Sequence, residues 1–160
     1  MKANKLITTT QEFDIKITGI TLLSKEEYEE NRDIIPAVNW WWLRSPGGNQ
    51  SLAALVRSGG SLNSSRVHYD YGYVRPALYV WNPQSSNLKR GDNFELAGYT
   101  WTMLSNDLAL CDETVGQTCF RRDWRAEDAN VYDKSDIKQW LHDWAEESGI
   151  EFMMQTFSPD

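Results

Sequence analysis

The sequence predicts a single α+β domain in which two helices cover a set of short antiparallel strands. Two stretches of strand length, the apolar residues 52–56 and residues 62–67, flank a pair of glycines. Residues 137–144 instead repeat apolar side chains at helical spacing. A chain of 160 residues with 41% hydrophobic residues is long enough to bury the core that such a domain needs.

The first elements are predicted to be a half-buried strand and a capped helix. Apolar and polar residues alternate over residues 13–17, which is the period of a strand with one buried face. Ser24 and Glu27 have the spacing of a capping box, so a helix is expected over residues 25–32. The helix should end before Pro36, because the residue preceding a proline avoids helical geometry.

A hairpin and a tyrosine-rich loop are predicted next. The glycine pair between residues 52–56 and 62–67 suits the positive φ angles of a tight turn, so these two runs should pair as antiparallel strands. Residues 69–73 are expected to form a loop. Residues 74–80 should form another strand, placed at an edge or a bulge because Pro76 has no N–H group to donate.

The second half of the chain predicts a meander and a second helix. Short strands are expected over residues 94–96, 99–104 and 108–110. The helix should begin after Ser135 or Asp133, which have capping side chains. Gly149 is placed to end it.

The chain is expected to form one compact domain over residues 1–160. Residues 84–87 have the composition of a linker. They separate a first half, residues 13–83, from a second half, residues 88–150.

Charge is distributed unevenly between these halves. The chain carries a formal net charge of −7, yet no acidic residue occurs between Ile34 and Tyr69. The overall charge argues against general binding to nucleic acid or to anionic membranes. A stretch so poor in charge and rich in Gly, Ser, Asn and aromatic residues is either core or a contact surface.

Two motifs resemble an uncharacterised domain family of bacteria and phages. Residues 41–47 read WWLRSPG and residues 72–78 read GYVRPAL, close to the WWLRSPG and GVRPAL signature of that family. A further family pattern, a GD-x-F-x-x-x-G-x-x-W hairpin followed by a helix with a WL pair, is similar to residues 91–101 and 135–141. The two parts stand in the reverse of the family order, which implies a circularly permuted domain or halves exchanged between copies.

This family is similar to the C-type-lectin-like fold in its formylglycine-generating-enzyme branch. The resemblance implies a lectin-like fold and a place beside the variable proteins of phage and bacterial diversity-generating retroelements, whose surface codons are randomised. The oxidase chemistry of that branch depends on cysteines. Cys111 and Cys119 lie in the other half of the chain from both motifs, so that chemistry is not carried over.

A ligand-binding surface is predicted along the hairpin and the loop that follows it. Tyrosine gives a large contact area at low entropic cost, and Ser and Asn side chains give adaptable hydrogen bonds. The alternative is a solvated β-loop region, since these residues are also common in turns. The candidate ligand-binding residues are Asn49, Ser51, Asn63, Ser64, Ser65, His68, Tyr69, Asp70, Tyr71 and Tyr73.

A second group of residues is expected to act structurally. Tryptophans can stack on sugars and bases, but core packing is the preferred interpretation of the run at residues 40–42 and of Trp124 and Trp144. The arginines should donate hydrogen bonds to loop carbonyls or to a buried carboxylate. The structural candidates are Trp41, Trp42, Arg44, Arg75, Trp101 and Trp140.

The sequence contains little that indicates catalysis. Neither His68 nor His142 adjoins a nucleophile, and we expect no catalytic residue, no metal site and no cofactor. Reduced thiols are favoured for the two cysteines over a disulfide. The chain has no signal-peptide pattern and no membrane span, so synthesis in the cytoplasm is expected, which is compatible with later assembly into a virion.

The function predicted from these observations is non-enzymatic. A phage or prophage protein would display a variable, lectin-like recognition surface for a protein or glycan on a cell or particle surface. The first alternative is a structural, decoration or assembly subunit that forms homo-oligomers, and the second is an enzyme of unknown chemistry.

Overall fold

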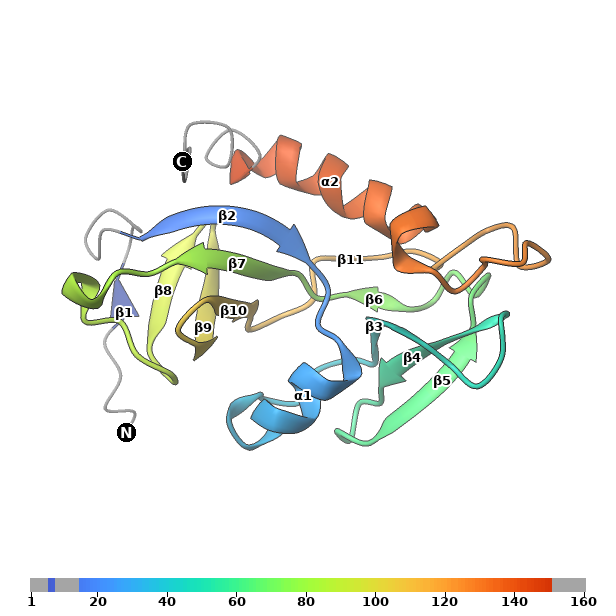
Figure 1. Cartoon of the computed structure of the whole chain (residues 1–160), viewed down its shortest axis with the longest axis horizontal. Helices are drawn as coiled ribbons and strands as arrows, with labels where there is room; N and C mark the ends of the chain where they lie inside the picture. The colour runs from blue at the N-terminus through green and yellow to red at the C-terminus, as the bar shows by residue number, and fades with distance from the viewer. Residues whose placement is uncertain (1–5, 8–14, 151–160) are drawn as a thin grey trace.

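The computed structural model describes residues 6–7 and 15–150, which form two β-sheets and two α-helices (Figure 1). The strands are β1 (Leu6–Ile7), β2 (Lys16–Thr21), β3 (Trp41–Pro46), β4 (Leu52–Val56), β5 (Leu62–Arg66), β6 (Tyr73–Val74), β7 (Ala77–Trp81), β8 (Asn93–Leu96), β9 (Tyr99–Ser105), β10 (Leu108–Cys111) and β11 (Gly116–Gln117). The helices are α1 (Lys25–Asn31) and α2 (Asp136–Ser148), with 3-10 turns η2 (Arg32–Ile34), η3 (Gln84–Ser86) and η4 (Tyr132–Lys134).

The strands divide into a six-stranded and a five-stranded sheet. The six-stranded sheet has the order β1-β8-β9-β10-β7-β2, and only its β1–β8 pair is parallel. The five-stranded sheet has the order β11-β6-β3-β4-β5, with β3 and β6 parallel. Sheets and helices together make an α+β fold, as the sequence predicts.

Arg75 joins the two sheets where the chain crosses between them. The chain crosses between the sheets from β2 to β3, from β6 to β7 and from β10 to β11. The fully buried Arg75 guanidinium donates to the carbonyls of Cys111 at 2.7 Å, Asp112 at 3.1 Å and Pro36 at 3.1 Å. Its carbon Cζ lies 4.9 Å from the centre of the Trp41 ring. One side chain therefore links all three crossings through the several N–H donors of its guanidinium.

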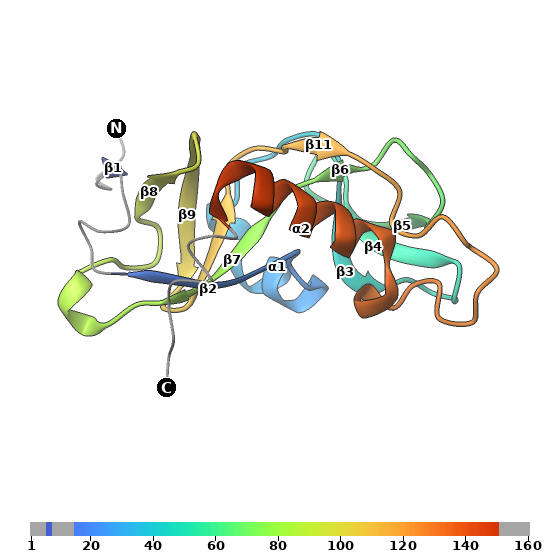
Figure 2. The ribbon, with the colours of Figure 1, turned by 90° about the horizontal axis from the view of Figure 1, so that it is seen from above.

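The two helices cover opposite sides of the five-stranded sheet. Figure 2 shows α2 lying over the region where the two sheets meet, whereas α1 lies on the other side in Figure 1. Trp42 belongs to the core beneath α2, which includes Ile137 and Leu141. Its neighbour Trp41 belongs to the second core cluster, with Tyr28 of α1. Successive residues of a strand point to opposite faces, so the tryptophan run contributes to both cores.

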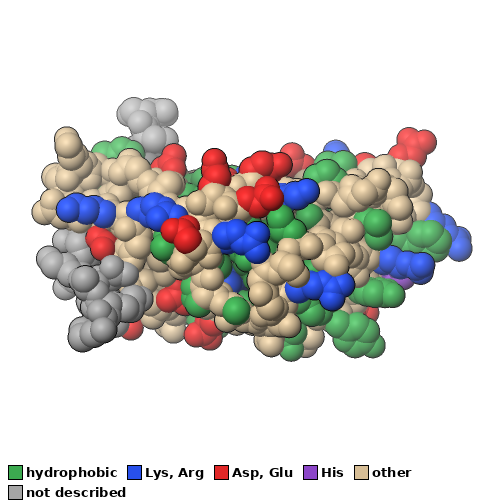
Figure 3. All heavy atoms as spheres, turned by 90° about the horizontal axis from the view of Figure 1, so that it is seen from below, with side chains coloured by type: hydrophobic (Ala, Val, Ile, Leu, Met, Phe, Trp, Pro, Cys, Tyr) green, Lys and Arg blue, Asp and Glu red, His purple; other side chains and the backbone are tan. Residues whose placement is uncertain are grey.

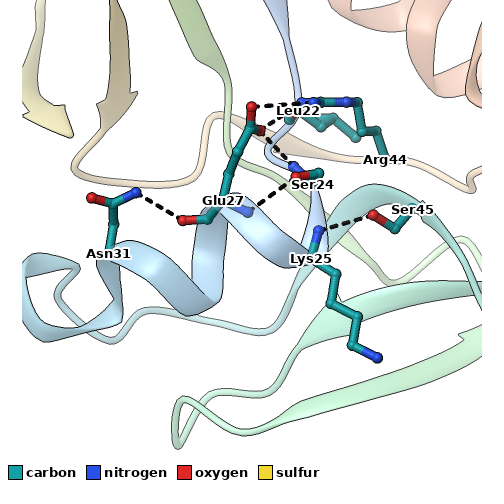
Figure 4. Close-up of polar contacts among 7 residues, drawn as sticks. All are labelled: Leu22, Ser24, Lys25, Glu27, Asn31, Arg44 and Ser45. Carbon is teal, nitrogen blue, oxygen red and sulfur yellow. Dashed lines mark hydrogen bonds and ion pairs between the residues drawn. The ribbon is translucent and has the colours of Figure 1, made fainter. Parts of the chain in front are cut away.

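The helix boundaries follow from the predicted caps. The Ser24 hydroxyl accepts from the Glu27 N–H at 3.0 Å while the Glu27 carboxylate accepts from the Ser24 N–H at 2.8 Å, which confirms the capping box (Figure 4). Ser135 caps α2, whose end is formed by Gly149 at a φ of +89°. These local signals need only a few adjacent residues, which is why the sequence identifies them.

Three regions differ from the sequence predictions. The strand expected over residues 74–80 is divided by Arg75 and Pro76 into β6 and β7, which belong to different sheets. The expected linker over residues 84–87 contains η3, in which Ser86 is buried. This segment connects β7 and β8, which belong to the same sheet. Of the strand expected over residues 13–17, Phe13 and Asp14 lie outside the described residues, and β2 continues to Thr21.

Candidate ligand-binding site

The β4–β5 hairpin is held from both of its ends. At the turn, the Tyr28 hydroxyl and the Arg32 guanidinium of the α1 region donate to the Gly60 carbonyl at 2.6 and 2.9 Å. Gly60 has a φ of +96°, a conformation that L side chains rarely adopt. At the other end, the Asn130 amide donates to the carbonyls of Asn49 and Leu52 at 2.9 and 3.1 Å. These contacts fix the hairpin as a framework for surface side chains.

The base of α1 supports the same framework. The Arg44 guanidinium of β3 donates to both oxygens of the Glu27 carboxylate, at 2.7 and 3.2 Å, and to the Leu22 carbonyl at 2.6 Å (Figure 4). Burial alone raises the pKa of Glu27, but the hydrogen bonds from Arg44 and from the Ser24 N–H outweigh it, so the pKa lies below its usual value. The ionised carboxylate thus ties α1 to β3.

A groove of about 610 Å³ lies over one face of β4 and β5, and we call it the edge groove. The side chains of Leu55, Asn63 and Ser65 share this face, since Leu55 pairs with Asn63 and Ala53 with Ser65 in register. The edge groove is lined by Trp40, Leu55, Arg57, Ser58, Gly59, Ser61, Asn63, Ser64, Ser65, Tyr69 and Tyr71.

Three aromatic rings give the edge groove its apolar surface. Tyr69 and Tyr71 are exposed by 44% and 73%, and Trp40 is half-buried. Trp40 packs edge-on against Trp42 with ring centres 5.1 Å apart. Gly72 permits this packing, because a Cβ atom there would lie 2.1 Å from the Trp42 Nε1 and 2.7 Å from the Trp40 Cη2.

The end of β11 and the residue that follows it brace the tyrosine loop. The Gln117 side chain donates to the Tyr71 carbonyl at 3.1 Å, and the Thr118 N–H donates to the Gly72 carbonyl at 3.0 Å. The Trp42 indole N–H donates to the Thr118 carbonyl at 2.9 Å. The backbone of the loop is therefore tied down while the rings of its tyrosines stay exposed.

The predicted ligand-binding residues fall into two groups. Those that line the edge groove are Asn63, Ser64, Ser65, Tyr69 and Tyr71. The other group does not: Asn49 and Ser51 hydrogen-bond each other in the β3–β4 loop, His68 and Asp70 face the segment around residues 122–124, and Tyr73 packs against the second core cluster. The edge groove therefore gathers half of the predicted set.

His68 belongs to an aromatic cluster next to the edge groove. Its ring centre lies 5.5 Å from that of Tyr69 and 5.7 Å from that of Trp124. Its Nδ1 is buried, and no described residue offers it a hydrogen bond. Trp124 was expected in the core and is instead exposed by 42%, with the Arg125 guanidinium 4.8 Å from its ring centre. That prediction is wrong because the segment around Trp124 runs along the surface.

Most of the structural candidates are completely buried. Trp41, Trp42, Arg75 and Trp101 have at most 1% of their surface exposed. Trp140 is half-buried and packs so closely on the backbone that a Cβ atom at Gly116 would lie 2.6 Å from its ring. These residues hold the fold that carries the edge groove.

Sequence reasoning missed the apolar and cationic parts of the edge groove. The sequence predicts core packing for Trp40 as for Trp41 and Trp42, and the predicted ligand-binding residues do not include Arg57. Trp40 precedes the first residue of β3, so it escapes the burial that β3 imposes on Trp41 and Trp42. The signal available in the sequence was the absence of acidic residues around Arg57.

The edge groove combines hydrogen-bonding side chains with aromatic rings. Its lining offers hydroxyls, an amide, aromatic rings and one guanidinium, and it contains no carboxylate and no imidazole. Cys111 and Cys119 are buried free thiols, and burial raises the pKa of Cys111 to about 12, which keeps that thiol protonated at neutral pH. Among residues 6–7 and 15–150, no group of three His, Cys, Asp or Glu residues is arranged to hold a metal ion.

Comparison with known proteins identifies one domain. Residues 10–81 match a family model described as a domain of unknown function, DUF6273. This match contains α1, β3 and the hairpin, and so agrees with the resemblance to an uncharacterised family over these residues. No curated protein and no solved structure matches the chain. In the described part of the chain, no helix has the length and apolar character required to cross a membrane.

Proposed function

We propose that this chain is a non-enzymatic recognition protein that binds a protein or glycan ligand in the edge groove. The observation that carries the proposal is the combination of exposed aromatic rings with short polar side chains on a braced hairpin. A preorganised surface loses little conformational entropy when it binds, and aromatic anchors surrounded by adaptable hydrogen-bonding groups are typical of recognition sites. The lining supplies no general acid or base of the carboxylate or imidazole type, which favours binding over catalysis.

The proposal extends to the origin and the fold of the chain. We propose that the chain is a lectin-like variable protein of a phage or prophage, with the polar and tyrosine positions of the edge groove as the diversified set. Support comes from their placement, since Asn63, Tyr69 and Tyr71 are exposed and their backbone is held by residues outside the set. Sequencing the locus from many isolates should show substitutions concentrated at these positions. Uniform variation along the chain would contradict this part of the proposal.

Ligand binding is tested with a matched pair of tyrosine variants. The chain is applied to a glycan array and to a peptide array, and any ligand found is titrated against Tyr71→Ala and Tyr79→Ala. Tyr79 is also exposed, at 38%, but lies on β7 in the other sheet. Tyr71→Ala should weaken binding about tenfold or more, since truncation of a central aromatic costs about 2 kcal/mol. Equal effects of the two substitutions would contradict a site in the edge groove.

An assembly subunit is the second candidate. The observation that favours it is the exposed aromatic pair Tyr69 and Trp124, whose rings both pack against the His68 ring. Figure 3 shows hydrophobic and cationic side chains gathered at the end of the molecule where Figure 1 places β5. Sedimentation at increasing concentration distinguishes the two functions. An oligomer that is lost with Trp124→Ala and retained with Tyr71→Ala would favour assembly.

A further inference from the structure

The outer edge of β5 faces away from the rest of the five-stranded sheet. β5 ends the strand order of that sheet, and within the described residues no strand pairs with it on its outer side. The Arg57 N–H donates to the Ser61 carbonyl and the Val67 N–H to the Ser51 carbonyl, which fixes the hydrogen-bonded pairs of the hairpin. Because such pairs alternate along antiparallel strands, the backbone groups of Leu62, Ser64 and Arg66 point outward.

Two of these outward groups already have local partners. The Ser64 N–H donates to the Asn63 Oδ1 at 2.7 Å, and the Arg66 carbonyl accepts from the Tyr69 N–H at 3.2 Å. The Leu62 N–H and carbonyl, the Ser64 carbonyl and the Arg66 N–H remain directed outward. Edge strands are commonly protected by charged side chains, by proline or by bulges, and the one charged side chain of β5 is Arg66. β5 contains no proline, and it pairs with β4 in continuous register over its whole length.

Hollows lie on both faces of this edge. The edge groove contains Asn63 and Ser65, whose side chains share one face. A second hollow of about 350 Å³ is lined by Leu62 and Ser64, which belong to the opposite face, and by Lys25, Pro46, Gly47, Gly48, Ala54 and Asn63. Both hollows include Asn63 and Ser64, so they meet at the outer edge of β5.

The charged side chains that line the two hollows are all positive. Arg57 lines the edge groove and Lys25 lines the second hollow, while neither lining contains Asp or Glu. Arg66 is exposed on β5 itself. This contrasts with the net charge of −7 for the whole chain. A ligand that lies along β5 with negative side chains would therefore meet complementary charge.

We infer that the ligand of this site is an extended, acidic peptide segment of a partner protein, which adds to β5 as a further strand. This inference rests on the proposed function of the edge groove. An added strand forms main-chain hydrogen bonds with the edge and directs alternate side chains to opposite faces, here into the two hollows. A second copy of this chain fits less well, because its β5 carries no acidic side chain and its exposed Arg66 has the same sign of charge as Arg57 and Lys25.

The probe is an array of octapeptides in which Glu alternates with Val, Thr or Tyr. A matched array carries Lys in place of Glu, and the strongest binder is labelled with fluorescein for anisotropy titrations against the full chain. The acidic array should bind and the basic array should not. Methylating alternate backbone nitrogens of the peptide should weaken binding at least tenfold, because it removes main-chain donors without changing the peptide charge.

Protein variants locate the bound peptide. Arg57→Glu should weaken binding at least tenfold, whereas Lys89→Glu, an exposed charge reversal beside the other sheet, should leave it within twofold. Ser64→Pro should abolish binding while preserving the fold, since a proline whose nitrogen faces outward is tolerated on an edge strand. If Ser64→Pro fails to fold, amide exchange of the unmodified chain decides: the Leu62 N–H should become protected when the peptide binds.

The possible outcomes separate this inference from the function it rests on. Neutral oligosaccharides that bind with sensitivity to Tyr71→Ala but not to Arg57→Glu or Ser64→Pro would overturn the peptide and retain the recognition groove. Peptide binding that survives backbone methylation would overturn strand addition. Self-association abolished by Ser64→Pro would assign the edge to a second copy instead. A chain that binds neither the peptide arrays nor the glycan array would contradict both the inference and the proposed function.

Discussion

β10 and β5 are strands of similar length with opposite surroundings. All four residues of β10, Leu108–Cys111, are buried between β7 and β9. None of the five residues of β5, Leu62–Arg66, is buried, although β5 pairs along its whole length with the well-buried β4. Backbone pairing alone therefore does not determine what a strand contributes. β10 stabilises the core, whereas β5 closes the five-stranded sheet with polar groups that are available for contact.

The contrast between buried core and exposed surface should be largest in the stability lost on Trp42→Ala. Trp42 is fully buried in the core beneath α2 and donates to the Thr118 carbonyl. Its truncation should lower the free energy of unfolding by about 3–5 kcal/mol. Urea unfolding followed by circular dichroism measures the loss. Trp124→Ala is the matched control and should cost less than about 1 kcal/mol, because that ring is exposed. Similar losses for both would contradict the division between core and surface tryptophans.

Gly72→Ala should have the next largest effect, at the junction of core and groove. The added methyl group would overlap the indoles of Trp42 and Trp40, which are packed against each other. Overpacking of this kind costs about 1–3 kcal/mol, and the shift of Trp40 should also alter the tryptophan fluorescence. Gly48→Ala serves as control, since its Cβ atom would meet nothing within 4 Å. An unchanged spectrum and stability for Gly72→Ala would contradict the tight contact.

Glu27→Gln should lower stability by about 1–2 kcal/mol at neutral pH, because it removes the charge that Arg44 binds. The pKa of Glu27 in the folded chain is below its ordinary value of 4.5. Its contribution is therefore present above that value and is lost as the pH falls through the lower, folded pKa. Unfolding curves at several pH values should show the wild type and the variant converging in acid. A difference that stays constant with pH would exclude the ion pair as its source.

The smallest effect on stability is expected for Tyr71→Ala. The ring is exposed by 73%, so its removal should change the free energy of unfolding by no more than about 0.5 kcal/mol. The same variant is expected to lose ligand binding about tenfold or more. Thermal unfolding and ligand titration of one preparation compare the two quantities. Strong destabilisation would show that Tyr71 supports the fold and would remove it from the recognition surface.

The sequence predicts the parts of this fold that short segments determine. Ser24 and Glu27 identify the start of α1, Ser135 and Gly149 delimit α2, and the glycine pair identifies the β4–β5 hairpin. Each of these signals depends on hydrogen bonds or φ angles within a few residues. The same local reasoning locates the polar residues of β5.

The parts that could not be predicted depend on contacts between distant segments. The division of β6 from β7 requires Arg75 to reach carbonyls at Pro36, Cys111 and Asp112, a partnership invisible in local sequence. Whether a tryptophan is core or surface also depends on what packs over it. For that reason Trp40 and Trp124 could not be separated from their buried counterparts, and half of the predicted ligand-binding set lies outside the edge groove.

Backbone-amide NMR of the labelled full chain tests the central claim most directly. A ligand from the peptide or glycan arrays is titrated into the protein while the shifts of the backbone amides are followed. The account predicts that the perturbed amides cluster at β5 and the tyrosine loop, around Asn63, Ser65, Tyr69 and Tyr71, with β10 unaffected. Perturbations confined to the six-stranded sheet would show that recognition takes place elsewhere and would contradict the account.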